Sequence, residues 1–288
     1  MKRFHLISLA CAILLALASI SSARTLDEIR QEGVLRHLGV PYANFVTGQG
    51  DGLSVELIQR FASYLGVRYE FVPTSWSNVI SELTGHQVKP DGKKALIGAE
   101  VPVRGDLIAN GLTILPWRQQ VLDYSDPTFP TQVWLIAAAA SPLKPITPSS
   151  DQTDITATRL LLPGVSLMGK KNTCLDPALY PFASDPLTTV YFDGNLNDLF
   201  PAVLAGEADC TLLDVPDALV AISRWPGEVK VLGPLSEQQA MGVGFRKDNP
   251  DLREAFNLFY AQLRLSGTYR ELVKKYYPAV FDYYPDFF

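Results

Sequence analysis

The stretch GLTILPWRQQVLDYSDP, Gly111–Pro127, places one arginine just after a short apolar run. The run, Leu107–Ile114, has the length and composition of a buried strand. Arg118 follows it, and a guanidinium carries a rigid fork of N–H donors that fits a carboxylate through two hydrogen bonds. If it faces a cleft, Arg118 is therefore predicted to clamp an anion. The alternative is a surface ion pair with Asp123 or Asp126.

The first 23 residues have the pattern of an export signal. Lys2 and Arg3 precede the apolar run Leu6–Leu17, and a small-residue cleavage site ends at Ala23. The apolar run holds about a dozen residues, fewer than the roughly 20 that a membrane span needs. We expect a soluble mature chain that begins near Arg24 and is exported to the periplasm.

Composition excludes several classes of protein. The formal net charge of −5 is a poor match to nucleic-acid binding, which needs concentrated positive charge. His37 and His86 lie far apart with no other ligand at metal-binding spacing, so we predict no metal and no cofactor. Cys174 and Cys210 either form a disulfide in an oxidising compartment or remain a loop thiol and a core thiol.

Helical and strand patterns alternate along the chain, which predicts an α/β fold with largely parallel sheets. Thr25–Glu28 is a capping box that opens a short helix. Leu53–Leu65 has apolar residues at helical spacing. Ser75 is predicted to cap a helix over Trp76–Leu83. Residues 86–104 hold prolines and glycines and are predicted to form an irregular loop.

Two extended segments, Thr128–Ala140 and Gln239–Phe245, are long enough to cross from one lobe to another. A second set of strands and helices lies between them. After the second crossing, Asn249 is predicted to cap one helix and Thr268–Glu271 is a capping box for the next. The aromatic ending Tyr283–Phe288 is expected to pack on the first lobe, or to form a docking patch.

Three segments together resemble one family. They are Gly111–Pro127, Ala208–Leu219 (ADCTLLDVPDAL), and Gly242–Pro278, which starts GVGFRKDNPDLREAFN and ends GTYRELVKKYYP. In this order, behind an export signal, they resemble periplasmic (extracellular) solute-binding proteins of the polar amino-acid type, which serve ABC importers. The resemblance implies a two-lobed type II fold, in which each lobe is a mostly parallel sheet flanked by helices and two hinge strands cross between lobes. It assigns residues 1–23 to the signal peptide, 24–131 and 242–288 to lobe one, and 132–241 to lobe two.

The resemblance also implies which residues bind the ligand. Arg118 matches the arginine that holds the α-carboxylate of the ligand, and Thr113 and Gly111 match neighbouring contacts. Leu115 stands where the family has a second threonine. A dry site must answer both charges of a zwitterion, because an unpaired buried charge is costly.

Asp214 matches the aspartate that binds the ligand's ammonium group. It follows an apolar strand, and the carboxyl ends of strands are where open α/β sheets bind ligands. A helix N-cap is its alternative role, and Asp217 is predicted to be a solvated residue of the same helix. Tyr42, Phe45 and Trp76 match positions that wall the cleft, with ordinary core packing as the alternative for each.

The loop after the strand Val165–Met168 reads GKKNTCLDP and departs from the family pattern. Thr173 is the predicted hydrogen-bond donor to the ligand carboxylate, with Asn172 as second choice. Lys170 or Lys171 could reach an acidic ligand side chain, although exposed lysines are usually solvated. The side chain of the ligand is therefore not predicted.

No residue matches a known nucleophile arrangement, so we predict no catalytic residues. The expected function is capture of an amino acid or similar small zwitterion by a monomer that delivers it to the membrane permease of an ABC transporter. One alternative is a periplasmic cyclohexadienyl-type dehydratase on the same fold. That reaction needs a general acid, for which Glu82 and Glu100 are the nearest candidates. The other is a ligand-sensing subunit for a separate receptor.

Overall fold

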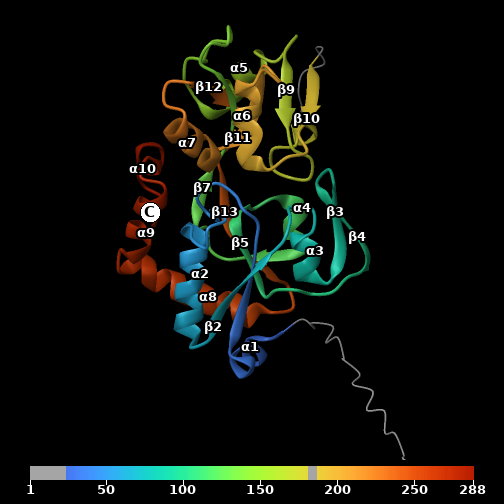
Figure 1. The fold of residues 1–288 in the computed structure, drawn as a ribbon, viewed down its shortest axis with the longest axis vertical. Helices are drawn as coiled ribbons and strands as arrows, with labels where there is room; N and C mark the ends of the chain where they lie inside the picture. Colours follow the sequence, from blue (N-terminus) through green and yellow to red (C-terminus); the bar gives the residue numbers. More distant parts are fainter. Residues whose placement is uncertain (1–23, 181–186) are drawn as a thin grey trace, which may run out of the picture.

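The computed structural model describes residues 24–180 and 187–288. The predicted export signal, residues 1–23, lies outside the described residues. Two α/β lobes are stacked along the long axis of the molecule, and β7 and β13 run between them (Figure 1). Within the described part of the chain, no helix combines the length and apolar character needed to cross a bilayer.

Lobe one is built on a sheet in the order β2-β1-β5-β13-β6, with β7 also paired to β13. Strands β1, β2 and β5 are parallel, whereas β13 is antiparallel to β5, β6 and β7. The strands are β1 (Val34–Gly39), β2 (Arg68–Pro73), β5 (Leu107–Thr113), β6 (Leu122–Tyr124), β7 (Phe129–Thr131) and β13 (Gln239–Arg246). The helices are α1 (Leu26–Glu32), α2 (Leu53–Leu65), α3 (Val79–Thr84), α4 (Pro116–Gln119), α8 (Pro250–Leu265), α9 (Thr268–Tyr276) and α10 (Val280–Tyr283).

Lobe two is built on a sheet in the order β10-β9-β11-β8-β12. Strands β9, β10 and β11 are parallel, and β8 is antiparallel to both β11 and β12. The strands are β8 (Val133–Ala138), β9 (Ser166–Gly169), β10 (Thr188–Tyr191), β11 (Cys210–Asp214) and β12 (Val229–Pro234). The helices are α5 (Asp151–Arg159), α6 (Leu199–Leu204) and α7 (Val215–Arg224).

Helix α1 shows how local sequence determines an element. The hydroxyl of Thr25 accepts from the backbone N–H of Glu28, whose carboxylate accepts from the backbone N–H of Thr25. The helix ends at Gly33, which has φ = 69°. Glycine takes this left-handed conformation without the steric cost that a Cβ adds. The predicted capping box is confirmed.

The predicted helix over Trp76–Leu83 is wrong in its start. Helix α3 begins at Val79, and Asn78 occupies the N-cap position without a side-chain hydrogen bond to the helix. The hydroxyl of Ser75 instead pairs with that of Ser77 at 2.9 Å. A turn therefore separates β2 from α3, and Trp76 lies in that turn.

The predicted irregular loop at residues 86–104 is also wrong. It contains a β-hairpin of β3 (His86–Asp91) and β4 (Lys94–Glu100). Both strands are largely exposed, so they lack the alternating burial pattern that identifies a strand in a sequence. The turn signal was present, because Asp91 precedes Gly92, which has φ = 58°.

The predicted N-cap position at Asn249 is confirmed, whereas the predicted capping box at Thr268 is wrong. Asn249 occupies the N-cap position of α8, but its amide donates to the carbonyl of Arg24 at 2.8 Å. Gly267, not Thr268, is the N-cap of α9, because the helix starts one residue earlier than the capping box requires.

The C-terminal aromatic residues pack against the body of the protein, as expected. The ring of Phe288 lies 5.6 Å from that of Phe129 in lobe one. The ring of Tyr283 lies 5.5 Å from that of Trp134 on β8. The ending therefore contacts both lobes.

Candidate functional site

Arg118 lies in the short helix α4, directly after β5, and is buried. Its Nη1 donates to the carbonyl oxygen of Thr113 at 2.9 Å, which anchors the guanidinium to the end of the strand. Its Nε has no partner among the described residues. The alternative ion pair with Asp123 or Asp126 is absent from the described part of the chain, and Asp123 pairs with Lys247 at 3.2 Å instead.

Asp214 is the last residue of β11 and lies in the N-cap position of α7. The alternative role places it correctly at the helix N-cap, but its side chain makes no capping hydrogen bond to the helix. Its Oδ2 accepts from the hydroxyl of Tyr42 at 3.1 Å and from the thiol of Cys174 at 2.9 Å. Oδ1 has no partner among the described residues. Tyr42 belongs to lobe one, so this aspartate links the two lobes.

Burial raises the pKa of Asp214 to about 6, because water that would stabilise the carboxylate is excluded. Hydrogen bonds from Cys174 and Tyr42 oppose the shift, and so does the positive charge of Arg118. Arg118 and Asp214 therefore interact electrostatically across the interface between the lobes. Neither forms an ion pair with another described side chain.

Cys174 lies between the lobes. Its sulfur is 3.5 Å from the hydroxyl oxygen of Thr113, in addition to its contact with Asp214. Burial and the nearby carboxylate raise the pKa of this thiol well above its ordinary value, so it remains protonated at neutral pH. Cys174 and Cys210 are both buried free thiols, so the disulfide alternative is wrong for this structure.

Asp217 is the second buried carboxyl of this region. It is 6 % exposed, so the prediction of a solvated residue is wrong. Burial and the neighbouring charge of Asp214 raise its pKa well above the ordinary value. Its Oδ2 has no partner among the described residues. The signal was its position three residues after Asp214, which places both side chains on one side of a helix start.

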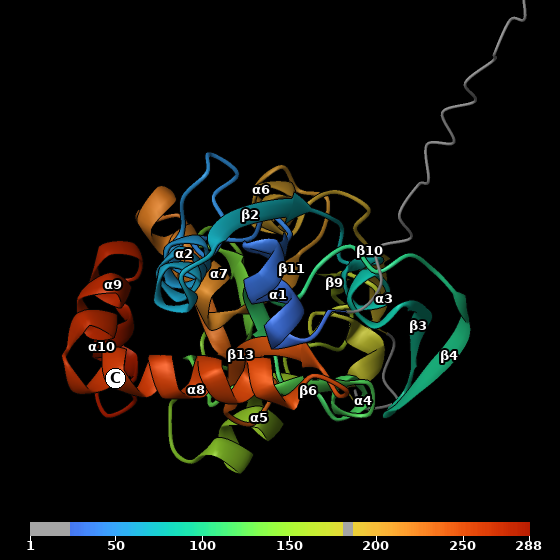
Figure 2. The same ribbon diagram turned by 90° about the horizontal axis from the view of Figure 1, so that it is seen from below.

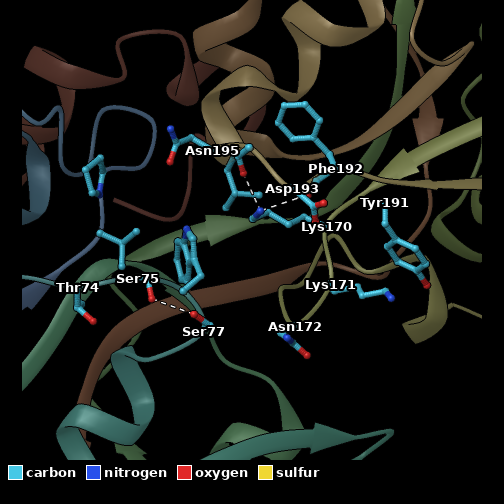
Figure 3. Close-up of a pocket in the computed structure, with 15 residues that line it drawn as sticks. Thr74, Ser75, Ser77, Lys170, Lys171, Asn172, Tyr191, Phe192, Asp193 and Asn195 are labelled. Carbon is cyan, nitrogen blue, oxygen red and sulfur yellow. Dashed lines mark hydrogen bonds between the residues drawn. The ribbon is translucent and has the colours of Figure 1, made fainter.

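A cavity of about 480 Å³ lies between the lobes, and neither Arg118 nor Asp214 is among its lining residues. Residues of the turn after β2, from Thr74 to Ser77, line it from lobe one. Lys170–Asn172 and Tyr191–Leu196 line it from lobe two. Figure 3 shows Ser75 and Ser77 facing Lys170 and Asn195 across the cavity.

Trp76 connects the cavity with the charged cluster. It lines the cavity, and its ring meets that of Tyr42 edge to face, with 5.5 Å between centroids. Lys170 donates its ammonium protons to the carbonyls of Phe192 and Gly194 at 3.3 and 2.6 Å. The lysine head is thus held by its own lobe.

The other predicted binding residues, Gly111, Phe45 and Thr173, make their contacts within the protein. An ideal Cβ on Gly111, which has φ = 69°, would lie 2.5 Å from Cδ2 of Phe45. Phe45 packs on Phe129 and Tyr277, each with 5.1 Å between ring centroids, which is core packing. The hydroxyl of Thr173 donates to the carbonyl of its own loop, at Lys170, over 2.8 Å.

The structure thus gathers Arg118, Thr113, Tyr42 and Asp214, and it adds Cys174, which the sequence did not indicate as a contact. Tyr180 also belongs to this region, since its hydroxyl donates to the carbonyl of Cys174 at 2.5 Å. No local pattern marks Cys174 or Tyr180, because their partners lie in the other lobe or across a loop.

Two α/β lobes that meet around buried, oppositely charged side chains define a two-lobed solute-binding protein. Residues 37–279 match the bacterial extracellular solute-binding proteins, family 3, and the chain belongs to that family. The family predicted from the sequence is therefore confirmed.

Curated relatives show what the chain is similar to. It is 27% identical to the histidine-binding periplasmic protein of Escherichia coli strain K12, over 84% of this chain and 86% of that protein. It is 25% identical to the membrane-bound lytic murein transglycosylase F of Desulfosudis oleivorans, over 91% of this chain. That match spans 53% of the transglycosylase, about half its length.

Solved structures show the same fold. A mutant of ArgBP from T. maritima has a TM-score of 0.69 at 24% identity, covering 88% of this chain and 99% of that one. An ancestral amino acid-binding protein, a precursor of cyclohexadienyl dehydratase, has a TM-score of 0.66 at 25% identity, covering 88% and 98%. The predicted two-lobed α/β fold is confirmed.

Proposed function

We propose that this protein captures an amino acid, or a similar small zwitterion, between its lobes and delivers it to the permease of an ABC transporter from the periplasm. One observation carries the proposal. A buried guanidinium of lobe one, Arg118, and a buried carboxylate of lobe two, Asp214, interact across the lobe interface and lack ion-pair partners among the described residues.

The charges of a zwitterion complement this arrangement. An ionised group that is buried without a partner costs several kcal/mol in a protein. Arg118 Nε and Asp214 Oδ1 both lack partners among the described residues. A ligand carboxylate at the first and a ligand ammonium at the second would satisfy both. Because the two groups come from different lobes, the ligand would also favour the closed arrangement.

The ligand side chain would extend toward the cavity lined by Trp76. Its walls supply an indole ring, hydroxyls at Ser75 and Ser77 and an amide at Asn195. Such a mixed lining suits a polar side chain with an apolar stem. The histidine-binding, cystine-binding and lysine/arginine/ornithine-binding relatives are in line with a polar amino acid.

A thermal-shift screen with the standard amino acids identifies the ligand. A ligand at about 100 times its dissociation constant stabilises the folded state by roughly 2.7 kcal/mol, so the melting temperature rises by several degrees. The ligand should not raise the melting temperature of Arg118→Ala. Arg30→Ala, at an exposed arginine, is the matched control, and the ligand should raise its melting temperature as it does for the wild type. If no amino acid raises the melting temperature, the proposed ligand class is wrong.

A dehydratase is the second candidate function, and Asp217 is the observation in its favour. Burial and the charge of Asp214 raise the pKa of Asp217 well above its ordinary value, and a carboxyl that holds its proton can act as a general acid. Glu82 is paired with Arg104 at 2.8 Å and Glu100 is exposed on β4, so neither fits that role. Turnover of a cyclohexadienyl acid that Asp217→Asn abolishes would establish this function, and a lack of turnover by the wild type would reject it.

A further inference from the structure

We propose that lobe one carries a second ligand site, beneath the β3–β4 hairpin, for a small amphipathic carboxylate. A cavity of about 250 Å³ lies between the hairpin and the end of β13. Figure 2 shows the hairpin standing out from lobe one beside α3 and α4. None of the residues that line this cavity lines the interlobe cavity of Figure 3.

A buried arginine supplies the anion-binding group. The side chain of Arg246 lines the cavity and is 6 % exposed. Its Nε donates to Asp248 at 2.8 Å, and its Nη2 donates to the carbonyl of Arg24 at 3.2 Å. Its Nη1 has no partner among the described residues. A buried cationic N–H group without a hydrogen-bond acceptor is unfavourable. A carboxylate oxygen of a ligand would accept from it.

The charged groups around Arg246 form a set of ion pairs. The carboxylate of Asp248 is 70 % exposed, so water screens much of its negative charge. Lys247 lines the same cavity with its ammonium group paired to Asp123 at 3.2 Å. Asp123 is shared with Arg253 at 2.9 Å, so two cations divide one carboxylate. Arg253 also pairs with Glu254 at 3.9 Å, so three carboxylates balance the three cations, and the preference for an anion comes from the Nη1 of Arg246, which has no partner among the described residues.

The remaining walls are apolar and determine the rest of the ligand. Val88, Val121 and Ile97 line the cavity. Val88 is buried, whereas Ile97 is 63 % exposed at the opening. An inorganic anion would leave this apolar surface in water, but an aromatic or branched acid would cover it. Burial of apolar area stabilises by about 25 cal/mol per Å², so the ligand that fits is a carboxylate with a compact apolar body.

Gln120 holds one wall of this cavity in place. Gln120, another lining residue, donates through Nε2 to the carbonyl of Lys93 at 2.8 Å and accepts through Oε1 from the N–H of Ala95 at 3.1 Å. These bonds fasten the hairpin to the residue that follows α4. The cavity thus has a fixed wall, which is a requirement for a site of definite shape.

Benzoate is the probe that tests the site, and benzylamine is its control of opposite charge. In a saturation-transfer titration, benzoate should bind the wild type with a dissociation constant at or below about 10 mM, and benzylamine should not. Arg246→Met should weaken benzoate at least about tenfold. Failure of the wild type to bind benzoate overturns the proposal, and so does equal binding of benzylamine.

Two neighbouring exposed residues provide a pair of variants that tests the site without substituting the buried Arg246. Ile97→Asp places a negative charge at the cavity opening and should weaken benzoate at least about tenfold. Leu96 is 55 % exposed on the same strand but does not line the cavity, so Leu96→Asp should bind benzoate like the wild type. Equal effects of the two variants contradict the assignment.

Arg118→Ala separates this site from the interlobe cleft. It should leave benzoate binding unchanged, because Arg118 does not line the hairpin cavity. Loss of benzoate binding in Arg118→Ala would place the probe in the cleft and overturn the second site. None of these benzoate titrations measures amino-acid binding. A failure of the hairpin site can therefore be distinguished from a failure of the proposed function.

Discussion

At Asp214 a buried carboxylate accepts hydrogen bonds from a phenol and a thiol, with Arg118 as the cation that affects its pKa. The folded protein accommodates this buried carboxyl group because the group either keeps a proton or lies beside a positive charge. A ligand ammonium is such a charge. In the proposed function, binding of a ligand ammonium beside Asp214 would therefore be linked to release of a proton.

This linkage predicts how affinity depends on pH. The folded-state pKa of Asp214, about 6, lies above its ordinary value of 3.8, so the ionised form is disfavoured and the ligand-free fold gains from protonation as pH falls through 6. An ammonium ligand needs the ionised form. Amino-acid affinity should therefore fall by up to about tenfold per pH unit below 6. Calorimetry at about pH 5 and pH 7 measures this, and equal affinity at both would contradict it.

Gly111 supports a second prediction at this scale. Gly111→Ala places a Cβ 2.5 Å from Cδ2 of Phe45 and strains a left-handed backbone, so the free energy of unfolding should fall by about 2–4 kcal/mol. Gly66→Ala is the matched control, because Gly66 has φ = 75° but a Cβ added to it would meet nothing within 4 Å. It should lose only about 1 kcal/mol. Urea denaturation compares them, and equal losses would show that Phe45 yields.

At the residue scale, the sequence motifs predict that Arg118 and Asp214 are ligand-binding residues, and the structure brings the two side chains together. They do not predict Cys174, because the thiol acquires its position from contacts in both lobes. The prediction for Asp217 is wrong, because the folded protein buries this side chain beside Asp214. Side chains that depend on long-range contacts leave no local pattern in a sequence.

Among the elements, prediction succeeded where burial followed a regular period. Helix α2 has its apolar residues on one face, and β5 is buried at every position. The β3–β4 hairpin escaped prediction because most of its residues are exposed. Its stability comes from strand pairing and from contacts to α3 and α4, which no periodicity reports.

Gln120 should control the order of that hairpin. Gln120→Ala removes both side-chain bonds to the turn, at a cost of about 1 kcal/mol each. The amide of Ala95 should then exchange with solvent deuterium about tenfold faster. Gln59→Ala, at an exposed position on α2, is the control and should leave this amide unchanged. Unchanged exchange in Gln120→Ala would show that strand pairing alone holds the hairpin.

Across the whole molecule, direct bonds join the lobes. Tyr42 donates to Asp214, the N–H of Ala43 donates to Oδ1 of Asn197 at 2.8 Å, and Thr113 contacts Cys174. Each bond joins a loop or strand end of lobe one to lobe two. Because these bonds are few among the described residues, we expect a ligand to be able to shift the balance between a closed and an open arrangement.

Tyr42→Phe tests this balance. It removes the donor to Asp214 but keeps the ring, so the closed arrangement should lose about 1–3 kcal/mol. Small-angle scattering should show a larger radius of gyration for the ligand-free variant, which returns to the wild-type value on saturation with ligand. Tyr64→Phe, on the exposed face of α2, is the control. An unchanged radius would mean that the other contacts suffice.

In the function proposed here, Arg118 and Asp214 hold the two charges of one zwitterion. Calorimetric titration of the amino acid found in the thermal screen tests this pairing most directly, using wild type, Arg118→Lys and Arg118→Ala. We expect Arg118→Ala to abolish binding and Arg118→Lys to retain weak binding, because lysine keeps the charge but loses the planar fork. A folded Arg118→Ala variant that binds the amino acid with wild-type affinity would contradict the assignment of Arg118 as the carboxylate-binding residue.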